Sequence, residues 1–372
     1  MEDAPTYERY QRQIILPQFG IEGQERLIHA RVLMIGAGGL GCPVLQYLTA
    51  AGVGTIGIID DDVVALGNLH RQVLYSVNDI GLSKAETAVR ILRQLNPEIN
   101  LIPINKRLTT ENTLEIFSDF DIIIDGTDNF STRYMVNDAC VLLNKSLVYG
   151  AISQFEGQVS VFNYPLNGSE AAVNYRDIFP HPPKEDEVLN CADAGVLGVL
   201  PGIIGGMMAN EAIKMITGTG EVLAGRLLTY NTLNNQVYLL SISPAKDTRS
   251  LIPKDQAEFL RTDYVWLCSS TDSELEIDAA TFCNLLESQR PDIIDVREVY
   301  EEPEVTAFPT IKIPLSQLEK NKDKVLSDTV VVFCQSGKRS LQAAKILTGI
   351  FGSSKKVYSL KGGLLGWKEH KQ

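Results

Sequence analysis

The 372-residue sequence has no paired cysteines, no surplus of basic residues and no long apolar run. Its six cysteines are scattered and none belongs to a Cys-x-x-Cys pair, so the pattern indicates neither a zinc site nor a disulfide framework. The 46 acidic residues outnumber the 34 basic ones, and the formal net charge of −12 argues against nucleic acid as the main partner, because such binding needs a basic surface. Scattered thiols and a polar N-terminus favour a reduced, cytoplasmic location.

One apolar stretch, residues 194–209, is shorter than the roughly 20 residues that a membrane span needs. It contains Pro201 and is followed by Glu211 and Lys214. We therefore expect a buried, tightly packed helix at this place and no membrane partner.

The hydrophobic pattern divides the chain into two α/β parts. From residue 31 to about 151, buried strands alternate with helices, which predicts a mostly parallel sheet with helices on both faces. From Gln158 on, meandering strands predict an antiparallel continuation. The predicted division is a first domain over residues 1–245, a linker over 246–273 and a small α/β domain over 274–372.

A glycine-rich turn joins the first buried strand to the next helix in the stretch "RVLMIGAGGLGCPV". Such turns cradle phosphates under a helix N-terminus in Rossmann-like folds, and this one contains Gly36, Gly38, Gly39 and Gly41. Asp60 closes the next strand, 19 positions after Gly41, where an acid accepts hydrogen bonds from ribose hydroxyls. These features alone fit an NAD-dependent oxidoreductase as well as an enzyme that binds another nucleotide and catalyses another reaction.

The polar residues downstream favour a triphosphate. A site that cuts a triphosphate must neutralise phosphoryl charge with Arg, Lys and Mg²⁺, whereas hydride transfer needs few cations. Asp128, in "GTDN", ends a buried strand and is able to hold Mg²⁺. The other candidates for nucleotide binding are Arg12, Asn68, Arg71, Gln72, Lys84 and Asn129.

Five motifs resemble those of the MoeB/ThiF/HesA family, in the family's order: "RYQRQ", "GAGGLG", "NLHRQ", "GTDN" and "CADAGVLG". The resemblance covers about residues 5–245. It implies a homodimer that uses MgATP to adenylate the C-terminal Gly-Gly of a small ubiquitin-like sulfur-carrier protein. By motif position it assigns the ribose to Asp60, the phosphates to Asn68, Arg71 and Lys84, Mg²⁺ to Asp128, and the triphosphate in the neighbouring subunit's site to Arg12.

The sequence departs from this family where many relatives hold a structural zinc with two Cys-x-x-Cys pairs. Asn174 and Asp177 occupy the first pair's positions, and "SISPAKDTR" near the second has no cysteine. Their oxygens suit zinc poorly, so we expect no zinc and a segment held by packing alone. Cys191 lies where relatives have a cysteine linked to covalent contact with the carrier or a sulfur donor; the alternative is a small buried thiol.

The C-terminal part contains a cysteine at the end of a buried strand, in "FCQSGKRS". Backbone N–H groups at the following helix start and two cations should favour the thiolate and hold an anion beside it. The predicted loop consists of Cys334, Gln335, Ser336, Gly337, Lys338 and Arg339.

This part is similar to a rhodanese from about residue 274 to 372, as "DVRE", "CQSGKRS" and "LKGGLLGW" indicate. In that family the loop cysteine carries a persulfide. The Cys-x4-Arg loop is one residue shorter than in dual-specificity phosphatases, which suits sulfur better than phosphate. Many rhodaneses have arginine where Gln335 stands, so thiosulfate is in doubt as the physiological donor.

The two parts together resemble MoeZ-type proteins and the eukaryotic molybdopterin-synthase sulfurylases. The first would make an acyl-adenylate on a carrier, and a Cys334 persulfide, loaded by a donor such as a cysteine desulfurase, would convert it to a thiocarboxylate. Three alternatives stay open: an NAD-dependent oxidoreductase, adenylation only with the rhodanese as a docking or sensing module, and a pure binding scaffold.

Overall fold

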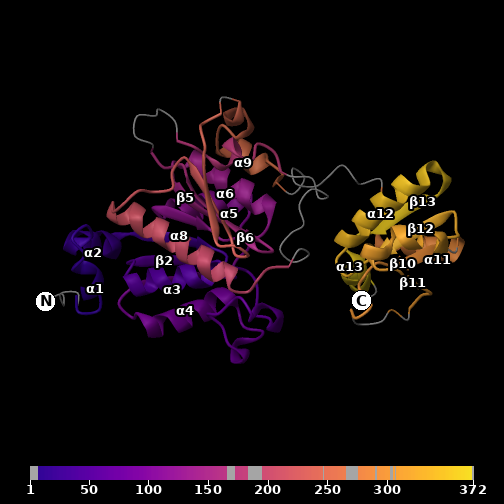
Figure 1. Ribbon diagram of the computed structural model, residues 1–372, viewed down its shortest axis with the longest axis horizontal. Helices are drawn as coiled ribbons and strands as arrows, with labels where there is room; N and C mark the ends of the chain where they lie inside the picture. The colour runs from indigo at the N-terminus through magenta and orange to yellow at the C-terminus, as the bar shows by residue number, and fades with distance from the viewer. Residues whose placement is uncertain are drawn as a thin grey trace. The chain divides into compact units, whose positions relative to one another are not determined.

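The computed structural model describes residues 7–165, 172–182, 195–245, 247–264, 275–289, 291–301, 305 and 307–370. The chain forms two compact units, Met1–Cys268 and Ser269–Gln372 (Figure 1). No helix within the described ranges is long and apolar enough to cross a membrane.

The first unit is built on an eight-stranded sheet in the order β3-β2-β1-β4-β5-β6-β7-β8. Its parallel part consists of β1 (Arg31–Ile35), β2 (Thr55–Ile59), β3 (Asn100–Ile104), β4 (Ile122–Asp125) and β5 (Ser146–Ser153). Its antiparallel part consists of β6 (Glu156–Phe162), β7 (Arg226–Asn231) and β8 (Gln236–Ser241). The predicted fold, a mostly parallel sheet continued by antiparallel strands, is confirmed.

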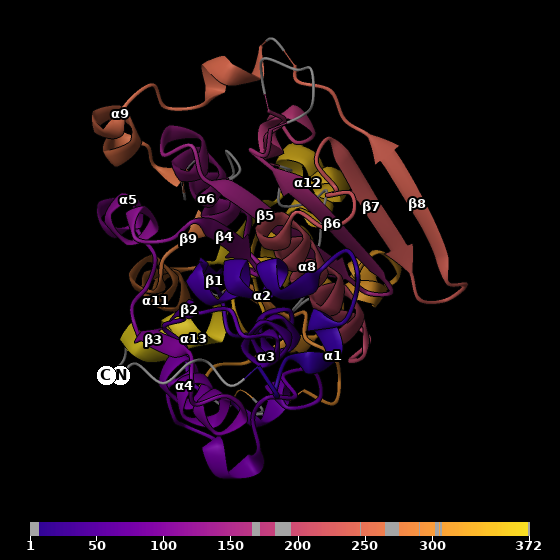
Figure 2. The same ribbon diagram turned by 90° about the vertical axis from the view of Figure 1, so that its left-hand side faces the viewer.

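Side chains of the central strands point alternately into two cores, which explains why these strands are apolar throughout. Val32 and Met34 of β1 belong to one core, and Leu33 and Ile35 to the other. Helices on opposite faces of the sheet close the two cores (Figure 2). The first face carries α2 (Gly20–His29), α3 (Gly41–Ala51), α4 (Lys84–Leu95) and α8 (Leu200–Thr217), and the second α5 (Thr110–Ser118), α6 (Phe130–Leu142) and α9 (Gln256–Arg261).

The remaining helical segments of this unit are short. Within the described residues they are α1 (Gln11–Ile14) and 3₁₀ turns at Leu66–Asn68, Val77–Asp79, Tyr175–Asp177 and Thr248–Leu251. The apolar stretch around Pro201 forms the first half of α8, which packs against α3, β5 and β6 as a buried helix. Pro201 fits there because the first turn of a helix has no partner for its N–H.

One carboxylate links two segments that are far apart in the sequence. Asp177 Oδ1 accepts hydrogen bonds from Ala245 N at 3.0 Å and from Thr248 Oγ1 at 2.5 Å. Its other oxygen accepts from the backbone and the side-chain nitrogen of Asn174, both at 2.8 Å. The expectation that packing alone holds this segment is therefore wrong, because hydrogen bonds that Asp177 accepts also hold it.

A buried ion pair extends this link. Arg176 binds Asp138 of α6 through two hydrogen bonds of 2.8 and 2.7 Å, and Tyr264 donates to the same carboxylate at 2.9 Å. Phe259 of α9 is fully buried in the same core. Residues 247–264, which fall in the predicted linker, thus pack on the first unit.

The second unit has a five-stranded sheet whose paired strands are all parallel, in the order β11-β10-β12-β13-β9. The strands are β9 (Glu276–Ile277), β10 (Asp292–Asp295), β11 (Ile311–Lys312), β12 (Thr329–Phe333) and β13 (Lys356–Leu360). On one face lies α12 (Lys338–Phe351), and on the other lie α11 (Ala279–Ser288) and α13 (Gly363–His370) (Figure 1). Short 3₁₀ segments follow at Leu315–Gln317, Glu319–Lys324 and Gly352–Ser354.

Candidate functional site

A cavity of about 440 Å³ lies at the carboxyl ends of β1, β2 and β4. Strand order reverses between β1 and β4, and open α/β sheets bind ligands at such a point. The residues predicted from the sequence that line this cavity are Gly36, Gly38, Gly39, Asp60, Arg71, Gln72, Lys84, Asp128 and Asn129.

The glycine-rich turn has the close contacts that its sequence predicts. Gly36 has φ of +85°, a conformation that favours glycine. Gly41 lies outside the cavity lining, and a Cβ there would come within 2.0 Å of the Gly36 carbonyl oxygen. Its role is to let α3 approach the turn. Ala37 N donates to Asp60 Oδ2 at 2.8 Å, which ties the turn to the end of β2.

Lys84 and Asp60 face the cavity from neighbouring elements. Lys84 is 5% exposed and its Nζ lies 2.8 Å from Asp62 Oδ2. Burial raises the pKa of Asp60, and the charge of Lys84 opposes that rise. Tyr75 donates from its hydroxyl to Ala37 O at 2.9 Å and is 3.2 Å from Lys84 O, so it joins the glycine turn to the start of α4.

The loop after β4 presents Asp128 to the cavity. Asp125, at the end of β4, is buried and accepts hydrogen bonds from Thr127 N at 2.9 Å and Thr127 Oγ1 at 2.7 Å. Arg133 of α6 donates to the Thr127 carbonyl at 2.9 Å, and Asn129 caps α6 by accepting from its backbone at 2.8 Å. Burial raises the pKa of Asp125. The Asp128 carboxylate is exposed in the cavity and is a hard oxygen ligand of the kind that Mg²⁺ takes beside phosphates.

Besides Gly41, the predicted site residues Asn68 and Arg12 do not line the cavity. Asn68 ends a 3₁₀ turn, and its carbonyl accepts from Arg71 N and Gln72 N at 3.0 and 2.9 Å, which orients those two residues. Arg12 is exposed in α1. Cys191 lies outside the described residues.

The cavity also contains cations that the sequence analysis missed. Lys106 and Arg107, which follow β3, and Arg133 of α6 line it. The signal available for the first two was a pair of basic residues shortly after a strand, β3. Cys42, at the start of α3, is no candidate nucleophile because burial raises the pKa of its thiol to about 12.

The second site lies where β12 meets α12. Cys334 is fully buried, and its Sγ accepts the N–H of Gly337 at 3.2 Å and lies 3.7 Å from Ser340 Oγ. Gly337 has φ of +94°, which bends the loop around the sulfur. The Gly-Gly turn before α13 supports the loop, since a Cβ at Gly363 would come within 2.4 Å of the Cys334 carbonyl oxygen.

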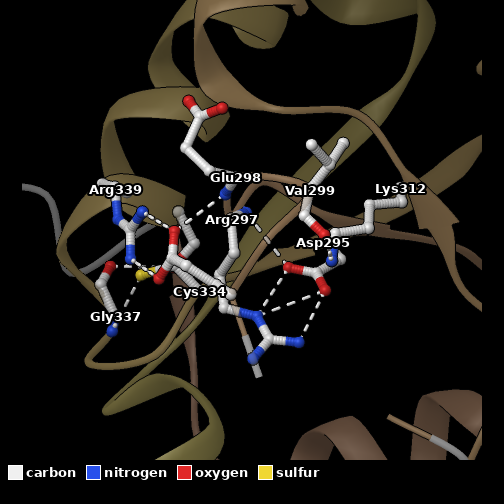
Figure 3. A network of polar contacts seen from close by, with 10 residues as sticks. Asp295, Arg297, Glu298, Val299, Lys312, Cys334, Gly337 and Arg339 are labelled. Carbon is white, nitrogen blue, oxygen red and sulfur yellow. Dashed lines mark hydrogen bonds and ion pairs between the residues drawn. The ribbon is translucent and has the colours of Figure 1, made fainter. Parts of the chain in front are cut away.

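The arginines beside Cys334 are bound to carboxylates, as Figure 3 shows for Arg297 and Asp295. Arg297 is fully buried, and its hydrogen bonds to Asp295 are 2.8 to 3.2 Å long. Arg339, in the first turn of α12, forms two hydrogen bonds of 2.5 and 2.8 Å with the Glu301 carboxylate. Of the other predicted loop residues, Ser336 is exposed and Gln335 accepts from Leu365 N at 3.2 Å.

Within the described ranges, no cluster of three or more His, Cys, Asp or Glu side chains has a geometry that holds a metal ion.

Comparisons with known families and proteins cover both units of the chain. The ThiF family model matches residues 10–251, and the rhodanese-like domain model matches residues 278–370. The "Sulfur carrier protein adenylyltransferase" of Thermus thermophilus is 53% identical over 63% of this chain and 87% of its own length. "Adenylyltransferase and sulfurtransferase MOCS3" of Xenopus laevis is 37% identical, over 98% of this chain and 87% of its own.

A third relative, "Probable adenylyltransferase/sulfurtransferase MoeZ" of Mycobacterium tuberculosis, is 41% identical over 98% of this chain and 93% of its own. Among solved structures, E. coli MccB with AMPCPP and MccA has a TM-score of 0.57 at 21% identity, over 66% of this chain and 74% of that one. At that identity the likeness shows the fold of the first unit.

Proposed function

Because this chain belongs to the ThiF family and continues into a rhodanese-like domain, we propose that it activates and then sulfurates a small ubiquitin-like carrier protein at its C-terminal Gly-Gly. The chain is an adenylyltransferase and a sulfurtransferase, like the relatives that match nearly its whole length. The observation that carries the proposal is a cavity at the carboxyl ends of β1 and β4. The glycine-rich turn, Asp60, several cations and Asp128 line it together.

In the adenylation step, a carrier carboxylate attacks the α-phosphorus of ATP, and the bond to the β-phosphate breaks so that pyrophosphate leaves. The backbone of the glycine turn faces the phosphates, and Asp60 accepts from the ribose hydroxyls. Arg71 and Lys84 stabilise the charge on the phosphoryl oxygens. To do so, Lys84 leaves Asp62 and binds a phosphate oxygen instead. Asp128 would hold Mg²⁺, which neutralises phosphate charge when bound.

In the sulfur step, the terminal sulfur of a Cys334 persulfide attacks the carbonyl carbon of the acyl-adenylate, and AMP leaves. The product is an acyl disulfide between the carrier and Cys334. A thiol reductant supplies two electrons, the S–S bond breaks, and the carrier leaves as a thiocarboxylate while Cys334 returns as a thiol. A cysteine desulfurase is the donor class that we propose for the persulfide.

The proposal includes a homodimer in the cytoplasm, in which Arg12 of each subunit reaches the partner's triphosphate. What supports it is the position of Arg12 in α1, where its side chain is exposed. Cys191 is proposed as a contact for the carrier or for the sulfur donor.

The decisive test is Asp128→Ala. We expect this variant to lose ATP–pyrophosphate exchange, because the phosphates lose their metal ligand, while its circular dichroism stays that of the wild type. Unchanged exchange would contradict the assignment of Asp128.

A second measurement separates sulfur transfer from adenylation alone. Mass spectrometry of a carrier incubated with ATP, the full chain and a sulfur donor should show one sulfur in place of one oxygen. Adenylated carrier that never gains sulfur would instead favour a docking or sensing role for the rhodanese-like domain.

A further inference from the structure

We propose that Glu301 sets the donor specificity of the Cys334 loop by neutralising Arg339, so that Cys334 takes sulfur from a persulfide in preference to thiosulfate. This inference rests on the proposed role of Cys334 as the persulfide carrier. It concerns a residue outside the loop, from the segment that follows β10.

The contact between Glu301 and Arg339 is a two-pronged ion pair. Both carboxylate oxygens are engaged, at 2.5 and 2.8 Å from the two terminal nitrogens of Arg339, and the two side chains are 26% and 27% exposed. The carboxylate is anchored in its own turn, since Glu298 N donates to Glu301 Oε1 at 2.8 Å. This geometry is the strong, planar form of a carboxylate–guanidinium pair.

The charge of Glu301 is permanent under ordinary conditions. Hydrogen bonding to Arg339 holds the pKa of its carboxyl at about 2, well below the usual range. Near neutral pH, Arg339 is therefore half of a neutral pair in the Cys334 loop.

The second arginine of the site is neutralised in the same way. Arg297 is bound to Asp295 by hydrogen bonds of 2.8 to 3.2 Å, on the side of the site away from Arg339 (Figure 3). These two arginines and two carboxylates sum to no net charge, and the side chain of Lys338, the other cation of the loop, lies outside the described side chains. The sulfur itself is contacted by neutral donors, Gly337 N and Ser340 Oγ.

The chemistry of the two donor classes differs in charge. With thiosulfate, the Cys334 thiolate attacks the outer sulfur, the S–S bond breaks, and its electron pair leaves with sulfite, a dianion. With a persulfide, R–S–SH, the thiolate attacks the terminal sulfur and the electron pair leaves with R–S⁻, which carries one charge at the site. An arginine already bound to a carboxylate stabilises a dianion poorly, so the site favours the persulfide.

The test uses the full chain and compares loading of Cys334 from three donors: thiosulfate, glutathione persulfide, and a cysteine desulfurase with cysteine. The rate is measured by mass spectrometry of the chain. Glu301→Gln frees the charge of Arg339, and we expect the thiosulfate rate to rise roughly tenfold relative to both persulfide rates. The double variant Glu301→Gln/Arg339→Gln should lose that gain.

Glu298→Gln is the matched control, because it removes the same charge three positions away. The Glu298 carboxylate points away from Arg339 in Figure 3, so we expect the wild-type ratio of rates. An equal rise in this variant, or no change of ratio in Glu301→Gln, would overturn the inference. So would a wild-type chain that loads from thiosulfate as fast as from the persulfides, whether or not the variant folds.

Failure of the proposed function gives a different result. If the wild type loads sulfur from none of the three donors, or if Cys334→Ala loads as the wild type does, Cys334 is not the carrier and both proposals fail. If loading depends on Cys334 but the ratio of thiosulfate to persulfide rates is the same in Glu301→Gln as in the wild type, only the specificity inference fails.

Discussion

Carboxylates behave differently at the two sites because burial outweighs the partners at one and not at the other. Burial raises the pKa of the Asp125 carboxyl, although the charge of Arg133 and the hydrogen bonds from Thr127 oppose that rise. Glu301 is only partly buried and binds the guanidinium of Arg339, and the pKa of its carboxyl falls to about 2. The balance of burial against hydrogen bonds and nearby charge thus decides whether folding favours the neutral or the charged form of each carboxylate.

The depressed pKa of Glu301 makes the second unit sensitive to acid. A carboxylate with a folded-state pKa below the unfolded value stabilises the fold above about pH 4.5, and this contribution is lost as the pH falls toward 2. Because the Glu301–Arg339 pair is partly exposed, we expect its contribution to the free energy of unfolding to be about 1–2 kcal/mol. Glu301→Gln should therefore be less stable than the wild type at pH 7, with the difference shrinking below pH 4.5 and nearly gone below pH 2.

Chemical denaturation of the full chain across this pH range measures the difference, read from the transition of the second unit. A gap of the same size at both ends of the range would show that Glu301 stabilises the fold by some means other than its charge.

At the scale of elements, both sites are built where parallel strands end. The loop after β4 is held from two sides, by Asp125 below Thr127 and by Arg133 on its carbonyl. The loop after β12 is held by Gly337 and by the Gly-Gly turn that precedes α13. In each case neighbouring residues fix the backbone that presents the reactive side chain.

Asp125 is therefore expected to act as a positioning residue. Asp125→Ala should release Thr127, leave Asp128 loosely placed, and raise the Mg²⁺ concentration for half-maximal ATP–pyrophosphate exchange by roughly tenfold, an effect of ~1.4 kcal/mol. Asp125→Asn keeps one acceptor oxygen and serves as the matched control, with a smaller shift. A uniform loss of exchange without any change in Mg²⁺ dependence would point to a purely structural role.

Local patterns were enough to predict most of these elements. The glycine spacing and the apolar run before it predict the β1–α3 turn, and Pro201 with the residues around it predicts a buried α8. Contacts between distant residues could not be predicted in this way. Examples are the hydrogen bonds of Tyr75 to Ala37, of Arg339 to Glu301 and of Thr248 to Asp177. The two residues of each pair lie far apart in the sequence and follow no helical or strand periodicity, so only the folded chain brings them together.

At the scale of the whole molecule, each unit has its own sheet and its own cores. The composition, two α/β patterns and the order of the motifs were sufficient to predict this organisation and the family. The pairing of Arg339 with Glu301 was not predicted, because the loop motif indicates two cations but does not contain the residues that bind them.

Separate cores imply separable activities. Cys334→Ala should abolish sulfur transfer to a carrier and leave ATP–pyrophosphate exchange within about twofold of the wild type, since a substitution inside the core of one unit has little effect on distant sites that share no partner with it. Exchange assays and carrier mass spectrometry on the same preparation check both halves. Loss of exchange as well would mean that adenylation depends on the second unit.

The Asp177 link has a consequence for the conditions that this corner of the first unit tolerates. A carboxylate bound to an amide and a hydroxyl has no ion for a chelator to remove and no thiolate for peroxide to oxidise. This cross-link forms as soon as the chain folds, without waiting for metal delivery. A cell short of zinc, or under oxidative stress, would leave it intact.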